Sequence, residues 1–252
     1  MTYFARLFLL AAIGLSPLIL LAAETPSAPT TQAKVPVVDG IVQPRRPLKD
    51  AIADAMAFLK KADQGYVPGK LDGPLAGYFS SAHVEEDGSP SKRTFCFPAR
   101  QHAYFIFTFL LYNKYSGEAE WLQRAKDLGD WNLAHSTPTD TAWPNLPWAV
   151  WTDGHGGGSG DKDATEPDKA AWFGKAYLAL YDATKDERYL NGAKKIAETL
   201  AKKQGEDGSW PFRVVPGDGT VRQQFGGAPV YYVEFFQLLS KKDSNPDWAK
   251  AY

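Results

Sequence analysis

Apolar and polar positions alternate along this chain in a pattern that recurs at intervals of about 67 residues. Three segments are almost continuously apolar, and each is followed by a short polar turn; they are residues 99–115, 168–184 and 229–242. After the second turn, Ala193, Ile196, Ala197 and Leu200 fall on one face at helical spacing, with lysines on the opposite face. The pattern predicts repeated helical hairpins, each with an apolar first helix and an amphipathic second helix.

Individual landmarks keep the same spacing. An aromatic-Leu-x-x-Ala-Lys motif begins at Trp121 and again at Tyr189, and Trp143-Pro144 recurs as Trp210-Pro211. Helical hairpins bury their apolar faces by stacking on their neighbours in a ring or a solenoid. We therefore expect an all-α fold, an α/α toroid of repeated helix hairpins.

Long segments join the predicted hairpins. Residues 77–97 and 210–225 carry aromatic residues on both sides of an Asp-Gly pair, which is typical of a small β-hairpin. We expect these segments to be long rim loops or small β-hairpins, gathered at one rim of the toroid, where a ring of helices leaves a concave mouth.

The two ends of the sequence suggest its domain organisation. Residues 1–23 have a charged start, an apolar run and small residues at its end, as in a secretory signal peptide. Residues 24–47 are rich in Pro, Thr and Ala and are expected to be a flexible spacer. The toroid domain is then 48–252, and Trp248 begins a further second helix that stops four residues later, so we expect the domain to be truncated.

Charge and cysteine content narrow the function classes. With 28 Lys and Arg against 29 Asp and Glu, the net charge of −1 is unlike the basic face of a nucleic-acid-binding protein. A cleaved signal peptide predicts a periplasmic or secreted protein without stable membrane association. Cys96 is the single cysteine and is expected to be a buried, unreactive thiol.

The loop that precedes the second apolar helix, residues 151–166, combines glycines with acids and one histidine. Thr165 and Asp168 have the spacing of a helix capping box, which is a structural role. Asp153, His155 and Asp163 are candidate catalytic residues, and the alternating carboxylates of Asp161 and Asp163 are candidate ligands of Ca²⁺. The alternative is a solvated loop.

Tryptophans and arginines of the long segments are candidate substrate contacts. Exposed aromatic rings beside acids hold sugar rings by stacking and hydrogen bonds, and the candidates are Trp143, Trp148, Trp151 and Trp210. Arg213 and Arg222 flank an Asp-Gly turn and could clamp the carboxylates of an acidic substrate. The alternatives are core tryptophans and solvated arginines.

Leu200, Gln204, Gly208 and Trp210 form an L-x3-Q-x3-G-x-W element. We expect Gln204 to hydrogen-bond exposed backbone at the helix end while Trp210 packs against a neighbouring helix. A similar element occurs in the repeat of squalene-type cyclases.

Residues 161–212 resemble family 10 pectate lyases, which are α/α toroids. The similarity lies in Asp161-Lys162-Asp163-Ala164-Thr165, in Lys185-Asp186-Glu187-Arg188-Tyr189, and in Gln204 followed by Gly208-Ser209-Trp210-Pro211. Parts of it recur in the six-hairpin glycosidase superfamily. Two features depart from the lyases: Lys162 stands where they have Asn, and residues 221–236 contain no Asp.

This resemblance implies a carbohydrate-active enzyme that carries out Ca²⁺-assisted β-elimination on a polyuronate. Asp161 or Asp163 would help to bind the cation, Arg213 would act at the substrate carboxylate, and a base would remove the C5 proton. We expect a polysaccharide or oligosaccharide substrate. Two alternatives remain: a glycoside hydrolase, for which Asp153 and Asp163 are the candidate carboxylates, and a non-catalytic carbohydrate-binding toroid. A cyclase-like toroid is a third hypothesis that fits the signal peptide poorly.

Overall fold

The computed structural model describes residues 37–42, 47–62, 95–152, 155–156 and 164–251. The chain divides into two units, residues 1–51 and residues 52–252, which are described separately. In the first unit, β1 (Val37–Val38) and β2 (Ile41–Val42) form an antiparallel hairpin. The turn residues Asp39 and Gly40 have φ values of 53° and 77°, which an Asp-Gly pair adopts readily. This hairpin lies within the predicted spacer, where the sequence analysis expected no element.

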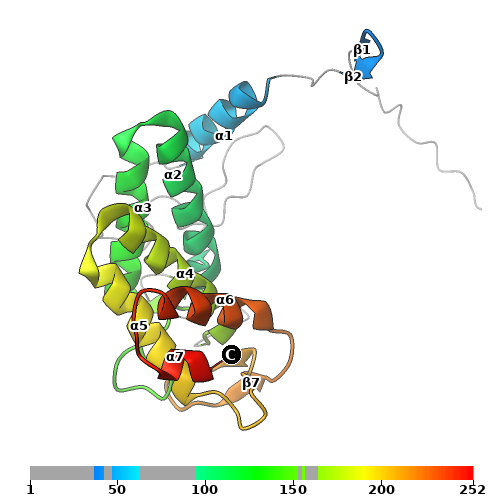
Figure 1. Ribbon diagram of the computed structural model, residues 1–252. Coiled ribbons are helices and arrows are strands. Elements are labelled where there is room, and N and C mark those ends of the chain that lie inside the picture. Colours follow the sequence, from blue (N-terminus) through cyan, green and yellow to red (C-terminus); the bar gives the residue numbers. More distant parts are fainter. Residues whose placement is uncertain (1–36, 43–46, 63–94, 153–154, 157–163, 252) are drawn as a thin grey trace, which may run out of the picture. The chain divides into compact units, whose positions relative to one another are not determined.

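Helical hairpins make up most of the described part of the second unit, as predicted (Figure 1). The helix α1 (Leu48–Ala62) begins at the end of the first unit and continues into the second, and η1 (Pro98–His102), one turn of π-helix, leads into α2. The first helices of the three hairpins are α2 (Ala103–Ser116), α4 (Pro167–Thr184) and α6 (Pro229–Ser240). The second helices are α3 (Ala119–His135), α5 (Glu187–Lys202) and the short α7 (Asp247–Lys250).

The turns inside the hairpins follow from their sequences. Gly117 ends α2 with φ of 76°, a left-handed conformation that costs glycine little. Lys185 ends α4 in the same way, with φ of 59°. Asp186 then caps α5, because its carboxylate accepts the Arg188 backbone N–H at 3.0 Å. Each first helix is thereby reversed into its second helix within a few residues.

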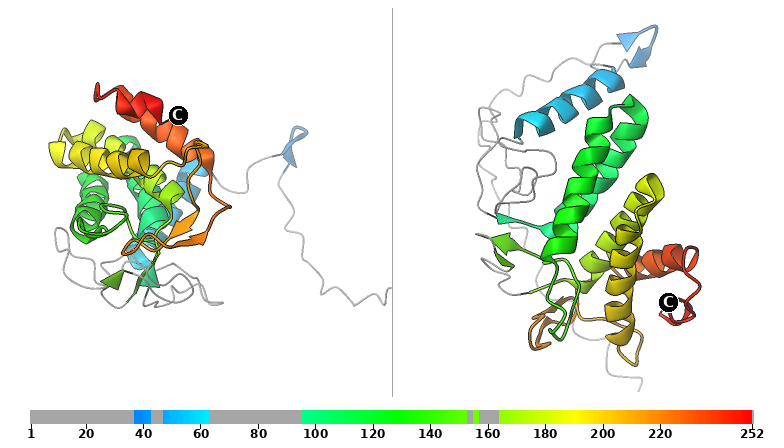
Figure 2. Two further views of the ribbon diagram at one scale, coloured as in Figure 1. Left: turned by 90° about the horizontal axis from the view of Figure 1, so that it is seen from below. Right: turned by 90° about the vertical axis from the view of Figure 1, so that its left-hand side faces the viewer.

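The helix α4 lies between α2 and α6 and packs against both, and α6 crosses beside the α4–α5 pair (Figure 2). Gly174 allows the close approach of α6, since a Cβ atom there would lie 2.4 Å from the ring of Phe235. In α3, Gly129 has the same function toward Leu180 of α4, at 2.5 Å. Small residues at these contacts let neighbouring helices interlock.

Large aromatic residues fill the core at repeated positions. Trp121, Tyr189 and Trp248 occupy the same position in the three second helices, and they are 1%, 0% and 1% exposed. Burying a side chain of this size contributes about 1.5–3 kcal/mol. The internal repeat predicted from the landmarks is therefore confirmed in the packing.

Short strands bring the long segments together. In one sheet, β4 (Trp151–Thr152) pairs with both β3 (Phe95–Cys96) and β5 (His155–Gly156). The strands β6 (Arg213–Val214) and β7 (Val221–Gln223) form the hairpin predicted at 210–225. Of the other predicted hairpin, residues 77–94 lie outside the described residues, and Phe95–Cys96 pairs with β4. Cys96 is buried, as expected.

Within the described residues, no helix combines the length and the apolar character that a membrane crossing requires. The predicted signal peptide lies outside the described residues.

Candidate functional site

The N-terminal ends of α4 and α6 meet around one buried carboxylate. Asp168, at the start of α4, is 0% exposed. Its Oδ2 accepts the backbone N–H of Ala228 at 3.0 Å and lies 2.5 Å from the ammonium of Lys169. Because Ala228 is the N-cap of α6, Asp168 ties the starts of the two first helices together. A buried carboxylate requires such partners to offset its lost hydration.

The segment before α4 is held by the β6–β7 hairpin. Thr165 forms an antiparallel bridge with Val214, with N–H···O distances of 2.8 and 3.0 Å, and its hydroxyl donates to the Pro147 carbonyl at 2.7 Å. The predicted capping box is therefore wrong. Thr165 is extended, and Glu166 occupies the N-cap position without a side-chain cap hydrogen bond.

Glu166 and Arg213 form an ion pair beside this bridge. The Arg213 Nη2 and Nε atoms lie 2.6 and 3.1 Å from Glu166 Oε1, and the guanidinium stands 5.0 Å from the ring centroid of Phe212. Arg213 thus lies beside the start of α4, with its charge offset by a protein carboxylate. Its predicted action on a substrate carboxylate stays a prediction. Arg222 lies on β7 and is exposed.

Three aromatic rings, one from each first helix, form a continuous series. The ring of Trp172 on α4 lies 5.5 Å from that of Tyr104 on α2 and 4.8 Å from that of Tyr231 on α6. Aromatic rings at these distances attract one another edge-to-face or offset. The indole Nε1 of Trp172 is buried and has no hydrogen-bond partner among the described residues.

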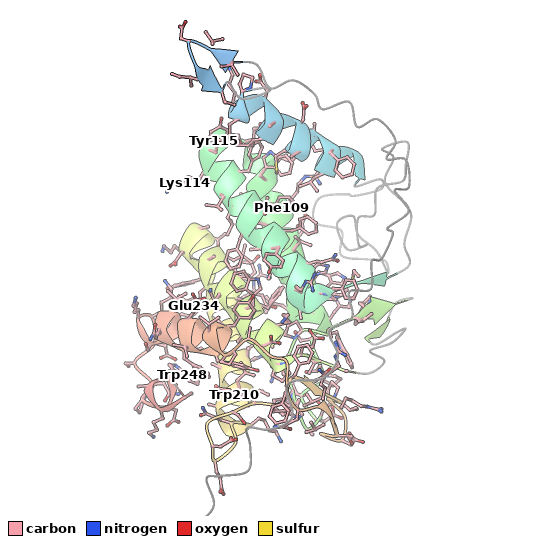
Figure 3. The ribbon with its side chains drawn as sticks, turned by 90° about the vertical axis from the view of Figure 1, so that its right-hand side faces the viewer. Phe109, Lys114, Tyr115, Trp210, Glu234 and Trp248 are labelled. Carbon is pink, nitrogen blue, oxygen red and sulfur yellow. The ribbon has the colours of Figure 1, made fainter. Side chains whose placement is uncertain are left out.

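Two lysines border these rings. Lys169 Nζ stands 5.6 Å from the ring centroid of Tyr231, and Lys175 Nζ stands 4.2 Å from that of Trp172, both within the range of cation–π attraction. The Lys175 ammonium also pairs with the carboxylate of Glu234 on α6, which Figure 3 labels. We call this set the aromatic–lysine strip; it consists of Tyr104, Lys169, Trp172, Lys175, Tyr231 and Glu234.

Parts of the strip are open to solvent. Tyr104 is 47% exposed and the Glu234 side chain is 46% exposed, while the Lys175 side chain is 12% exposed. The pKa of Tyr231 is raised, mainly by burial and next by its neighbour Tyr104, so its hydroxyl stays protonated at neutral pH. The strip therefore offers ring faces, cations, one accessible carboxylate and the neutral hydroxyl of Tyr231.

The structure places the predicted tryptophans against protein partners. Trp143 and Trp151 are 4% and 8% exposed. Trp148 is half-buried against the backbone of Gly156, where a Cβ atom would lie 2.1 Å from the indole. Trp210, which Figure 3 labels, stacks on Tyr232 of α6, with centroids 4.1 Å apart and planes at 9°. A sugar-stacking role for these four rings stays a prediction.

The expected packing of Trp210 against a neighbouring helix is confirmed by its stacking on Tyr232 of α6. The Trp210 indole N–H also donates to the Leu200 carbonyl at the end of α5, at 2.8 Å. Gln204 donates to the Gly208 carbonyl at 3.0 Å, in the turn that follows α5, and lies 3.5 Å from the carbonyl of Ala251, the C-cap of α7.

The structure describes only part of the glycine-rich loop of residues 151–166. Asp153, Asp161 and Asp163 lie outside the described residues, and His155 belongs to β5, where it pairs with Thr152. Among the residues that the structure describes, no three His, Cys, Asp or Glu side chains come together as metal ligands. The carboxylates of Glu166 and Asp168, which do lie here, are both engaged by cations.

The strip was not predicted from the sequence, although the repeat contained a signal for it. Tyr104, Trp172 and Glu234 share one position of the first helices, 68 and 62 residues apart, and Gln101, Lys169 and Tyr231 share another. The adjoining position is Phe in all three helices, namely Phe105, Phe173 and Phe235. The position that is Phe in every repeat indicates the face that packs in the core. The neighbouring position, which changes between Tyr, Trp and Glu, indicates a face that is not constrained by core packing.

Known structures with the same fold support the architecture. Those similar to this chain include a sugar epimerase from a ruminal bacterium (TM-score 0.57, 12% identity, 79% of this chain and 52% of that one). A cellobiose 2-epimerase from Spirochaeta thermophila has a TM-score of 0.56 and 13% identity, and the match covers 81% of this chain and 51% of that one. A family 76 glycoside hydrolase (mannosidase) from Bacteroides thetaiotaomicron has a TM-score of 0.51 and 14% identity, and the match covers 70% of this chain and 48% of that one. No family model and no curated protein matches the chain.

These structures are six-hairpin α/α toroids, and the chain has their fold over about half of their length. The predicted fold class, an α/α toroid of repeated helix hairpins, is confirmed.

Proposed function

We propose that this chain belongs to a carbohydrate-active protein whose aromatic–lysine strip binds an acidic polysaccharide or oligosaccharide. The observation that carries the proposal is the row of Tyr104, Trp172 and Tyr231 rings with lysine ammonium groups beside it. Sugar rings present apolar faces that stack on aromatic side chains, and a uronate adds a carboxylate that an ammonium group can bind. Solved structures that share the fold include epimerases and a glycoside hydrolase, which agrees with this choice of substrate class.

For the reaction, we propose β-elimination on a polyuronate. In this proposal Lys169, Lys175 and Arg213 hold substrate carboxylates, and Asp153, His155 and Asp163 are the candidates for the base that removes the C5 proton. Ca²⁺, bound with the help of Asp161 and Asp163, would supply positive charge at the uronate carboxylate. The carboxylates of Asp168 and Glu166 at the start of α4 are already engaged by Lys169 and Arg213, so a calcium site here depends on Asp161 and Asp163. The predicted signal peptide supports a periplasmic or secreted location.

A carbohydrate-binding toroid without turnover is the second candidate. It is favoured by the pairing of the cations that border the rings: Lys169 with Asp168, Lys175 with Glu234 and Arg213 with Glu166.

A glycoside hydrolase needs two carboxyl groups on opposite sides of the scissile bond. In the strip, Glu234 is accessible, while Asp168 beside it is fully buried.

The test is the ultraviolet absorbance of unsaturated uronate ends. The purified protein is incubated with pectate, alginate and glucuronate polymers, with and without Ca²⁺. We expect absorbance to rise and the rise to be abolished by a chelator. If a folded sample binds these polymers without any rise in absorbance, elimination is rejected; release of reducing ends would then indicate a hydrolase, and their absence a binding toroid.

A further inference from the structure

A groove of about 590 Å³ lies between the second helices α3 and α5, with α4 beneath them. Tyr177 of α4 lines it, five residues after Trp172 and therefore roughly 140° around the helix from the ring of the aromatic–lysine strip. The groove and the strip thus lie on different sides of α4. Its volume is within the range of pockets that enclose small organic ligands.

Gly192 shapes the floor of the groove. A Cβ atom at this position would lie 2.8 Å from the Leu133 side chain and 3.1 Å from the Tyr177 ring. The absence of a side chain here brings α5 close to both neighbours and leaves a small apolar floor. Asn145 closes one side, from a loop in which it has φ of 59°.

Hydrogen-bonding groups of every kind line the walls. Asp130 is an acceptor that already receives the Tyr189 hydroxyl at 2.9 Å and lies 3.3 Å from the Arg188 guanidinium. Arg188 is also paired with Asp186 at 2.7 Å, so its charge is offset. Asn145, Asn191 and Lys195, in contrast, have no side-chain partner among the described residues.

The Tyr177 hydroxyl is the second observation that indicates a ligand. The residue is 2% exposed, and its hydroxyl forms no hydrogen bond at bonding geometry within the described residues. The Ser136 hydroxyl, which also lines the groove, interacts with the Tyr177 hydroxyl outside strict hydrogen-bonding geometry and donates its own proton to the Asn132 carbonyl at 2.6 Å. A buried hydroxyl with so weak a partner is uncommon and costs stability unless something completes its bonding.

We propose that this groove is a second carbohydrate-binding site, which takes a sugar unit on the outer side of the hairpins. A hydroxyl group both donates and accepts, which suits a wall that mixes the amides of Asn145 and Asn191 with the ammonium of Lys195 and the carboxylate of Asp130. The two acids beside the groove, Asp130 and Asp186, balance its two cations, so it favours a hydroxyl-rich ligand over a phosphate. The proposal does not depend on the reaction at the aromatic–lysine strip.

The test follows backbone amide NMR signals of Asn191, Gly192 and Asn145 during titration of the purified protein. The probes are a neutral disaccharide series, digalacturonate and inorganic phosphate. We expect at least one sugar to shift these signals saturably and phosphate to leave them unchanged. The proposal would be overturned if no sugar shifted these signals, or if phosphate shifted them as much as the sugars did.

Two variants identify the groups responsible. The double variant Asn191→Ala, Lys195→Ala changes exposed positions of α5 to a good helix former, and should weaken sugar binding in the groove tenfold or more. Lys202→Ala, on the same helix but outside the groove, is the matched control and should bind as wild type does. Tyr104→Ala removes a ring of the strip and should leave the groove signals responsive, which separates this test from that of the proposed function. Undiminished binding by the double variant contradicts the assignment.

Discussion

Lys175 of α4 and Glu234 of α6 form an ion pair that joins two neighbouring first helices, and the same ammonium stands 4.2 Å from the ring of Trp172. The pair is asymmetric, because the Lys175 side chain is 12% exposed while that of Glu234 is 46% exposed. An accessible carboxylate on a sheltered cation is a contact that the carboxylate of a substrate can replace. The pair therefore bears on binding more than on stability.

Replacing Lys175 with Met keeps an apolar stem of similar length and removes the charge. We expect Lys175→Met to weaken binding of an acidic oligosaccharide about tenfold or more, since hydrogen bonds to charged groups contribute about 1.5–3 kcal/mol. The free energy of unfolding should change by less than about 1 kcal/mol, because solvent screens the half-exposed partner. Calorimetric titration and urea unfolding measure the two effects. Lys202→Met, at the exposed end of α5, is the control, and equal affinities of the two variants would show that Lys175 does not contact the ligand.

Arg213 is expected to stabilise the fold in addition to any contact with substrate. Arg213→Ala leaves the Glu166 carboxylate, whose side chain is 13% exposed, without its cation. We expect a loss of about 1–3 kcal/mol in the free energy of unfolding, the cost of a sheltered polar group without its partner. Arg222→Ala, on the exposed β7 strand of the same hairpin, should change it by less than about 0.5 kcal/mol. Equal losses in both variants would show that the ion pair contributes nothing.

The sequence predicted the fold well because each hairpin obeys local rules. The apolar runs, the landmarks at Trp121 and Tyr189 and the turn residues each identify one element, and stacking of the elements follows from their apolar faces. Thr165 shows where this reasoning stops. Its spacing to Asp168 fits a capping box, but the bridge to Val214, a residue 49 positions away, holds it extended.

The candidate site was less predictable, because its members come together only in the tertiary structure. Trp172 and Tyr231 are 59 residues apart, and each alone resembles a core aromatic residue. For Trp210 the sequence suggested two roles, a sugar platform and packing against a neighbouring helix; its stacking on Tyr232 of α6 confirms the second, and the first stays a prediction. Sequence position alone did not distinguish the two roles.

Gly174 is expected to be essential to the packing of α4 on α6. In Gly174→Ala the new Cβ would lie 2.4 Å from the Phe235 ring, which is 0% exposed and cannot move away. Overpacking of this kind costs about 1–3 kcal/mol, more than the gain of up to about 1 kcal/mol in helix propensity. Gly217→Ala is the matched control, since a Cβ there meets nothing within 4 Å. Urea unfolding should show a clear loss for the first variant only, and a Gly174→Ala protein as stable as wild type would contradict the close approach of the helices.

His102 makes the stability of the fold depend on pH. It is 0% exposed, and burial, with a smaller contribution from the charge of His135, lowers its pKa to about 3. The Nδ2 atom of Asn132 donates one hydrogen to the Leu128 carbonyl and the other to His102 Nδ1, each at 2.9 Å, so His102 Nδ1 must accept and the ring must be neutral.

The sign of the effect follows from proton uptake. The unfolded histidine, with a pKa of about 6.5, binds a proton between about pH 6.5 and pH 3, and the folded one does not. Stability is therefore fully present above about pH 6.5 and falls as the pH decreases, by up to about 1.4 kcal/mol per pH unit.

Urea unfolding of the wild type and of His102→Asn at about pH 7.5 and about pH 5.5 measures this contribution, in a range where most carboxylates stay ionised. The wild type should lose about 1–1.5 kcal/mol more than the variant between the two pH values. The comparison uses the change in the free energy of unfolding between the two pH values within each protein, so a lower overall stability of the variant does not affect it. Equal losses in the two proteins would show that His102 can take up a proton in the folded state.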